Sequence, residues 1–166
     1  MNKYLVAVFS VLHLLPHAAG ISPIGAIAIY AGAVGNRKTA WLAPLIPMLI
    51  RDIYVGFYDI RTMVSVYVGM VLSVWIGQAI LSHKRTLSRY LSAYIAGAVA
   101  FYLVANCASW YVEMQTPTVA DILTYYQNGL PYLVIGILAN IGFGTAMFAL
   151  HAWLLRGAPR GDAIAR

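Results

Sequence analysis

The sequence predicts an all-α integral membrane protein, a bundle of six transmembrane helices with both termini in the cytoplasm. The first observation behind this prediction is composition. Hydrophobic residues make up 61% of the 166 positions and charged residues only 10%, against about 25% charged residues in a soluble domain. The second is the mean hydropathy of +0.75, because a water-soluble chain of this length could not bury so much apolar surface. The third is the order in which apolar segments and basic residues alternate.

Six apolar segments lie between the charged breaks of the chain. A helix needs about 20 apolar residues to cross the hydrocarbon core, and the first two segments are shorter than that. These two could be a pair of tilted helices or one span plus a re-entrant hairpin, and we expect two spans. Pro44 and Pro47 should kink the third segment or delay its start. The six segments are residues 4–17, 22–34, 41–58, 63–81, 90–112 and 130–155.

The basic residues predict the orientation of these segments. With six spans and a cytoplasmic N-terminus, nine of the eleven Lys and Arg residues lie inside, and only Arg51 and Arg61 lie towards the outside. An excess of Lys and Arg in cytoplasmic loops is the rule for membrane proteins. This bias explains the net charge of +6 without a nucleic-acid partner. We expect one transmembrane domain, residues 1–155, a cytoplasmic basic tail, residues 156–166, and a longest outer loop over residues 113–129.

Small residues recur at every fourth position of the fourth segment, as Ser65, Gly69, Ser73 and Gly77. Lipid tails are as apolar as leucine, so helices associate in a membrane through close backbone approach rather than through apolar burial. We therefore expect this stripe to pack against protein within the bundle. A face that docks another subunit is the alternative.

Arg51 and Asp52 interrupt the third apolar segment. Charged groups at membrane depth are costly and usually face the bundle or an aqueous cavity. Asp52, Gly56 and Asp59 follow one another at i, i+4 and i+7, which places both carboxylates on one helical face. We expect Asp52 to line a polar cavity open to the outside, with Arg51 held by Asp59 or by an acid of another segment. An interfacial ion network that orders the outer loops is the alternative. The acids of other segments considered for Arg51 are Glu113 and Asp121.

Other polar residues within the apolar segments complete the candidate sites. An Asn in lipid generally forms hydrogen bonds across helices, so a purely structural role is the alternative for each Asn. His13 and His17 have a spacing that can place two imidazoles on one metal ion. However, Pro16 lies between them and no third ligand is evident, so a satisfied polar pair is the better interpretation. The candidate ligand-binding residues are Arg51, Asp52, Asp59, Asn106, Trp110 and Asn140.

Enzymatic chemistry has little support in the sequence. We find no phosphate-binding loop, no haem attachment motif and no zincin motif. The single cysteine, Cys107, has no convincing base beside it and excludes a disulfide scaffold. We therefore expect neither an enzyme nor a bound cofactor.

Five stretches of the chain carry a family pattern: SPIGAIA at residues 22–28, LIPMLIRD at 45–52, GF at 56–57, ANCASW at 105–110, and residues 125–131. Over roughly residues 17–150 the chain resembles an uncharacterised family of small bacterial inner-membrane proteins. Members have Asn-Phe before the Ser-Pro and Ser before the Asp, where this chain has Gly20-Ile21 and Arg51. That family is similar to the S components of energy-coupling-factor transporters, which have six helices, both ends cytoplasmic and a ligand pocket near the outer face.

Two functions compete at this level. The first is a substrate-binding component of a transporter, with a small-molecule or cation ligand in an outward-facing pocket. Such a component would need membrane protein partners that supply ATP hydrolysis. The second is a structural or accessory subunit of a larger membrane complex, with no ligand of its own. In both cases the lipid bilayer surrounds the protein.

Overall fold

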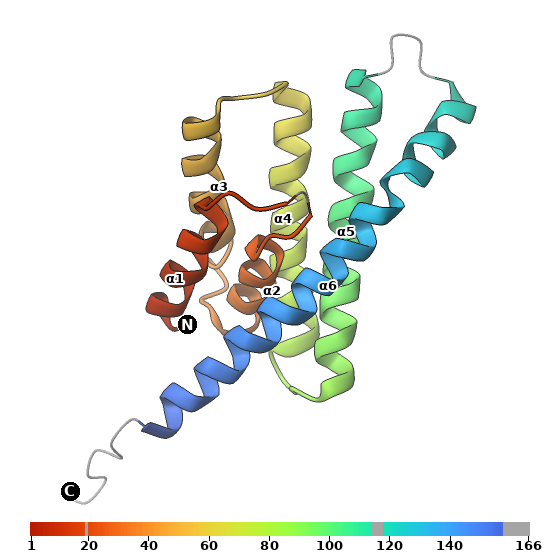
Figure 1. Ribbon diagram of the computed structural model, residues 1–166. Coiled ribbons are helices and arrows are strands. Elements are labelled where there is room, and N and C mark those ends of the chain that lie inside the picture. The colour runs from red at the N-terminus through yellow and green to blue at the C-terminus, as the bar shows by residue number, and fades with distance from the viewer. Residues whose placement is uncertain (19, 114–117, 158–166) are drawn as a thin grey trace, which may run out of the picture.

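The computed structural model describes residues 1–18, 20–113 and 118–157, and within these ranges it contains six α-helices and no strand (Figure 1). The predicted all-α fold with six helices is confirmed. Most of the predicted tail, residues 158–166, lies outside the described residues. The helices are α1 (Lys3–Leu14), α2 (Ile24–Val34), α3 (Leu42–Val55), α4 (Ile60–Leu81), α5 (Leu87–Glu113) and α6 (Val119–Gly157).

Three of these helices, α4, α5 and α6, are long and apolar enough to cross a membrane. In contrast, α1 and α2 have 12 and 11 residues. At 1.5 Å per residue they extend only about 18 Å and 17 Å, well short of a hydrocarbon core of about 30 Å. The expectation that α1 and α2 each form a complete span is therefore not met. The chain is a multi-pass helical membrane protein in which α4, α5 and α6 are long enough to span, whereas α1, α2 and the 14-residue α3 are shorter than the hydrocarbon core.

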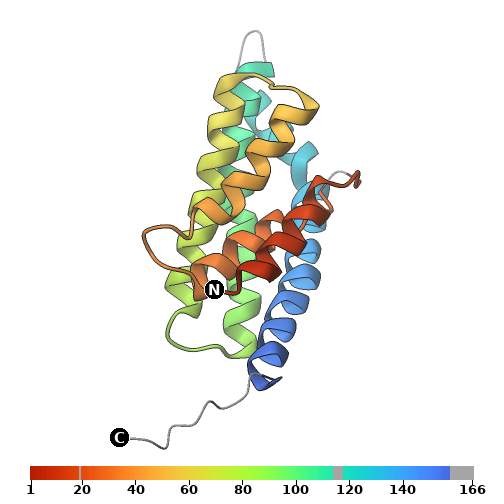
Figure 2. The same ribbon diagram turned by 90° about the vertical axis from the view of Figure 1, so that its left-hand side faces the viewer.

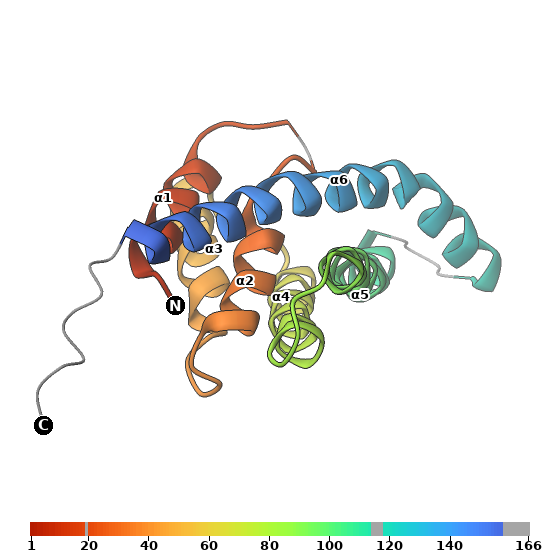
Figure 3. The same ribbon diagram turned by 90° about the horizontal axis from the view of Figure 1, so that it is seen from below.

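The short helix α2 is the centre of the bundle. Its residues from Ala26 to Ala31 have no exposed surface, and it contacts each of the other five helices. Seen from below, α2 lies between α3, α4 and α6 (Figure 3). Small residues of α2, among them Ala28, Ala31 and Gly32, let neighbouring helices approach its backbone closely, and this accounts for the central placement.

The small-residue stripe of α4 packs against protein, as predicted. A Cβ atom added to Gly77 would lie 2.3 Å from the carbonyl oxygen of Ile29 in α2, and one added to Gly32 of α2 would lie 1.9 Å from the carbonyl oxygen of Val74. The backbones of α2 and α4 therefore meet with no room for a side chain. Close approach of this kind is what small residues provide in membrane helices.

The helix α3 ends earlier than the sequence analysis expected. Gly56 follows Val55 with a φ of 109°, a backbone conformation that favours glycine, and the chain then turns into α4. Pro47 lies inside α3, where the missing N–H leaves one carbonyl without its intrahelical donor. The structure thus breaks the expected third segment at Gly56 instead of continuing it to residue 58.

The helix α6 begins earlier than expected, so most of the predicted outer loop over residues 113–129 is helical. The reason is a reciprocal pair of capping bonds. The backbone N–H of Asp121 donates to the hydroxyl of Thr118 (3.3 Å), while the backbone N–H of Thr118 donates to the carboxylate of Asp121 (2.9 Å). This arrangement is a capping box. α6 then continues through Pro131, and its axis runs obliquely across the other helices (Figure 1).

Hydrogen bonds join the N-terminus, the end of α2, the end of α6 and the α4–α5 loop at one side of the bundle. The backbone N–H of Asn2 donates to the hydroxyl of Tyr30 (3.3 Å), and that hydroxyl is 2.9 Å from Nδ1 of His151. Arg85, in the α4–α5 loop, donates to the carbonyl oxygen of Ala33 (3.0 Å). The start of the chain, the α4–α5 loop and the last turns of α6 therefore share one end of the molecule.

The described residues of the linker between α1 and α2, residues 15–18 and 20–23, lie at a height between the two ends of α4 in both side views (Figures 1 and 2). A Cβ atom added to Gly20 would lie 3.0 Å from Ile135 and 3.8 Å from the carbonyl oxygen of Tyr132. These two residues belong to the middle part of α6. The non-helical linker therefore lies beside the middle part of α6.

Candidate functional site

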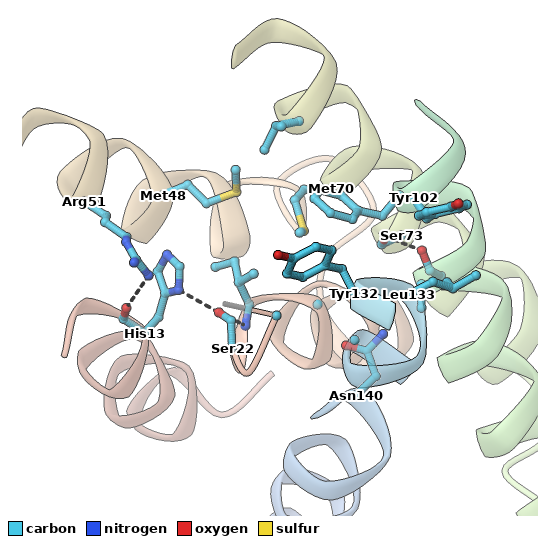
Figure 4. A pocket seen from close by; sticks show the side chains of 18 of the residues that line it. His13, Ser22, Met48, Arg51, Met70, Ser73, Tyr102, Tyr132, Leu133 and Asn140 are labelled. Carbon is cyan, nitrogen blue, oxygen red and sulfur yellow. Dashed lines mark hydrogen bonds between the residues drawn. The ribbon is translucent and has the colours of Figure 1, made fainter. Parts of the chain in front are cut away.

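A cavity of about 380 Å³ lies where this linker meets helices α3 to α6. Its volume is within the range of small-molecule sites, about 300–1,000 Å³. Figure 4 shows the phenol of Tyr132 projecting into it between Met48 and Ser73. All six helices or their ends contribute to the lining, so the cavity exists only in the assembled bundle.

The linker lines the cavity through His17, Gly20 and Ser22. The hydroxyl of Ser22 lies 2.8 Å from Nδ1 of His13 and accepts the backbone N–H of Ile24 (3.3 Å). This hydroxyl therefore joins the end of α1 to the first turn of α2, where N–H groups have no intrahelical acceptor. Non-helical backbone at membrane depth is tolerated where it is buried in protein or lines a cavity.

Arg51 reaches from α3 to the end of α1 (Figure 4). Its Nη1 donates to the carbonyl oxygen of His13 (3.2 Å) and to Nε2 of His17. Nδ1 of His17 is 3.3 Å from the carbonyl oxygen of Ala18, which can only accept, so Nδ1 carries the proton and Nε2 accepts from Arg51. The expectation that an acid holds Arg51 is therefore wrong. Because α3 ends at Val55, Asp59 does not lie on the same helix as Arg51, and the last turn of α1 and the linker each supply a neutral acceptor instead.

Asp52 lines the cavity beside Arg51. Its Oδ2 accepts a hydrogen bond from the hydroxyl of Tyr67 in α4 (2.8 Å). In the described ranges, the ion pair between Arg61 and Asp59 is the only one (3.0 Å). Two opposite charges thus line one cavity from successive positions of α3, and neither neutralises the other.

Asp59 has a different role from the one predicted. Its carboxylate caps α4 by accepting the backbone N–H groups of Arg61 (2.9 Å) and Thr62 (3.4 Å). The guanidinium of Arg61 also donates to it and holds the pKa of this exposed carboxyl below its ordinary value. The expected common face with Asp52 is wrong because α3 ends at Val55.

The two candidate asparagines also line the cavity. Nδ2 of Asn140 donates to the carbonyl oxygen of Tyr94 (3.3 Å), and Nδ2 of Asn106 donates to the carbonyl oxygen of Tyr102 (2.8 Å). Trp110 is not among the lining residues. Of the six predicted ligand-binding residues, the cavity therefore brings together Arg51, Asp52, Asn106 and Asn140, and it leaves out Asp59 and Trp110.

His13 and His17 line the same cavity, and their ring centres are 5.8 Å apart. Over residues 1–18, 20–113 and 118–157, no group of three or more His, Cys, Asp or Glu side chains is placed to hold a metal ion. The lone pair of His17 Nε2 accepts from Arg51, and a guanidinium at this nitrogen repels a cation. The geometry favours the alternative of a polar pair, which is satisfied only in part: Nδ1 of His13 meets the hydroxyl of Ser22 (2.8 Å), while the buried Nε2 of His13 has no hydrogen-bond partner among the described residues.

Several lining residues were missed by the sequence analysis, among them Met48, Met70 and Phe101. Met48 precedes Asp52 by one helical turn, so helical spacing alone could have indicated it. Met70 and Phe101 look like ordinary apolar span residues in the sequence. Only the packing of α4 against α5 turns them towards the cavity.

The model of a family of unknown function, DUF6580, matches residues 2–160 of the chain. The chain belongs to this family. This membership agrees with the resemblance to an uncharacterised family. Because the function of the family is unknown, membership assigns no activity to the chain. No curated protein and no solved structure matches the chain.

Proposed function

We propose that this member of the family is a substrate-binding component of a transporter in the bacterial inner membrane and that its ligand occupies the cavity. The observation that carries the proposal is the non-helical linker between two half-length helices, which lines a cavity together with Arg51 and Asp52. Broken helices that meet at a mid-membrane cavity are a recurrent way of building a substrate site in transporters.

The proposed topology keeps both termini in the cytoplasm. In this topology α1 and α2 form a hairpin that enters from the cytoplasmic side and returns to it, and α3 to α6 follow as alternating outward and inward segments. A re-entrant hairpin and a pair of complete spans would both return the chain to the cytoplasmic side before α3. The predicted distribution of basic residues is therefore the same in either case. The contacts that place Asn2, Ala33, Arg85 and His151 at one end support this topology.

The cost of charge at membrane depth supports a ligand role for Arg51 and Asp52. Even on the insertion scale, a charged side chain at the centre of a helix costs about 2.5–3.5 kcal/mol. A purely structural bundle could avoid this cost with apolar residues at the two positions. A cavity that binds a polar ligand provides a reason for both charges.

Mass spectrometry of the purified protein tests the proposal. The protein is purified in mild detergent, denatured, and the released small molecules are compared with those from Asp52→Asn and Asp59→Asn. We expect the wild type and the control, Asp59→Asn, to release one common molecule that Asp52→Asn lacks. A protein that carries no small molecule but purifies with fixed membrane partners would instead support the accessory-subunit hypothesis.

A further inference from the structure

We infer that the ligand is a zwitterion with an apolar body, whose anionic group lies at Arg51 and whose cationic group lies at Asp52. This inference rests on the proposed function and goes further by naming the class of ligand. Its basis is the presence of two opposite, mutually unpaired charges in the lining of one cavity.

Arg51 is equipped to hold an anion. Within the described ranges, both of its hydrogen bonds come from Nη1, and both acceptors are neutral. Nε and Nη2 present the edge of the guanidinium that matches a carboxylate in a two-bond fork. The contacts from the end of α1 and from the linker thus fix the guanidinium in place without neutralising it. A ligand carboxylate would supply the missing countercharge.

Asp52 makes a simple anion a poor ligand for the same cavity. Its only hydrogen-bond donor within the described part of the chain is the neutral hydroxyl of Tyr67, so its full negative charge remains. A ligand with one negative charge would be attracted by Arg51 and repelled by Asp52. A cation alone would experience the reverse. A molecule that carries both charges neutralises both side chains.

The remainder of the lining indicates an apolar body. Met48, Met70 and Phe101 contribute apolar surface, and methionine side chains adapt to irregular shapes. Two polar lining side chains already use their donors within the protein, since the hydroxyl of Ser73 donates to backbone oxygens of α4 and α5 (3.0 and 3.2 Å) and Nδ2 of Asn140 donates to the carbonyl oxygen of Tyr94. This part of the cavity therefore offers contact surface rather than further charge.

The first test is the charge of the molecule released from the purified wild-type protein. A molecule with both an anionic and a cationic group supports the inference. A molecule with one charge sign, or none, overturns the inference while the proposed function stands. If the purified protein releases no small molecule, the binding of added probes tests the inference instead.

Four probes share one phenyl body and differ in charge: phenylalanine, 3-phenylpropionate, 2-phenylethylamine and 3-phenylpropanol. Their binding to the detergent-purified protein is measured by isothermal titration calorimetry. We expect phenylalanine to bind roughly 10- to 100-fold more tightly than either singly charged probe, as charge-assisted hydrogen bonds imply. Equal binding of all four overturns the inference alone. No binding by any probe, with no molecule released, overturns the proposed function and the inference with it.

Matched variants assign the two charges. Arg51→Gln should abolish the preference for phenylalanine over 2-phenylethylamine, and Asp52→Asn should abolish the preference over 3-phenylpropionate. Arg61→Gln and Asp59→Asn make the same changes at the exposed ion pair outside the cavity and should leave both preferences unchanged. A loss of both preferences in the control variants would overturn the assignment. If a cavity variant fails to fold, the order of the four probes on the wild type still decides.

Discussion

Gly32 is the position at which the packing of the bundle can be tested most directly. A Cβ atom there would lie 1.9 Å from the carbonyl oxygen of Val74, whereas ordinary contacts begin near 3.4 Å. The obstacle is backbone, so no side chain can rotate away. Gly32→Ala therefore requires α2 and α4 to separate by about 1.5 Å or to distort along their interface.

The cost of this single methyl group is that of an overpacked core, about 1–3 kcal/mol. Over most of this range the cost exceeds the gain of roughly 1 kcal/mol in helix propensity that alanine has over glycine, and a clash with backbone belongs at its upper end. Gly142→Ala in α6 is the matched control, because a Cβ atom there meets nothing within 4 Å. The control should be as stable as the wild type or slightly more stable.

The assay is thermal unfolding in detergent, followed by tryptophan fluorescence for the three proteins side by side. We expect Gly32→Ala to unfold several degrees below the wild type and Gly142→Ala to unfold at or above it. Equal unfolding temperatures for Gly32→Ala and the wild type would refute the interpretation that α2 and α4 meet backbone to backbone.

Three further predictions concern the topology and the outer end. Reporter fusions after Arg61 should report the outside and fusions after Arg85 the cytoplasm; the reverse result would contradict the proposed orientation. Tyr67→Phe should destabilise the protein by about 0.5–1.5 kcal/mol, the usual worth of one hydrogen bond, and an unchanged unfolding temperature would show that the bond to Asp52 is not formed. Asp59→Ala should lower the unfolding temperature at neutral pH. Because the folded pKa of Asp59 is depressed, its stabilisation is present above its ordinary value and is lost as the pH falls through the folded pKa, so wild type and variant should converge in acid.

Local sequence features predicted much of the bundle. The uncharged stretches that became α4 and α5 needed no tertiary information, because their length and hydropathy suffice to indicate a membrane helix. The alternation of Gly and Ser along α4 also indicated correctly that this face meets protein. The capping box of Thr118 and Asp121 was a readable local signal, and attention to it would have placed the start of α6 at Val119.

The break after α3 shows how a local pattern can mislead. Asp52 and Asp59 share a helical face only if the helix continues between them. Gly56 adopts a positive φ and ends it, so Asp59 becomes the cap of α4 and pairs with Arg61. Glycine is compatible with both outcomes, so the local pattern could not decide between them.

The sequence by itself determined that the protein is a helical membrane protein, because hydropathy and helical periodicity are properties of neighbouring residues. The sequence also showed that the first two segments are short, but the tertiary structure alone decided that Arg51 meets the end of α1 and the linker that follows it. The carbonyl oxygen of His13, the ring of His17 and the guanidinium of Arg51 are separated by up to 38 positions along the chain. No local pattern encodes that meeting, since it depends on which helices pack around α2 and how far each one extends.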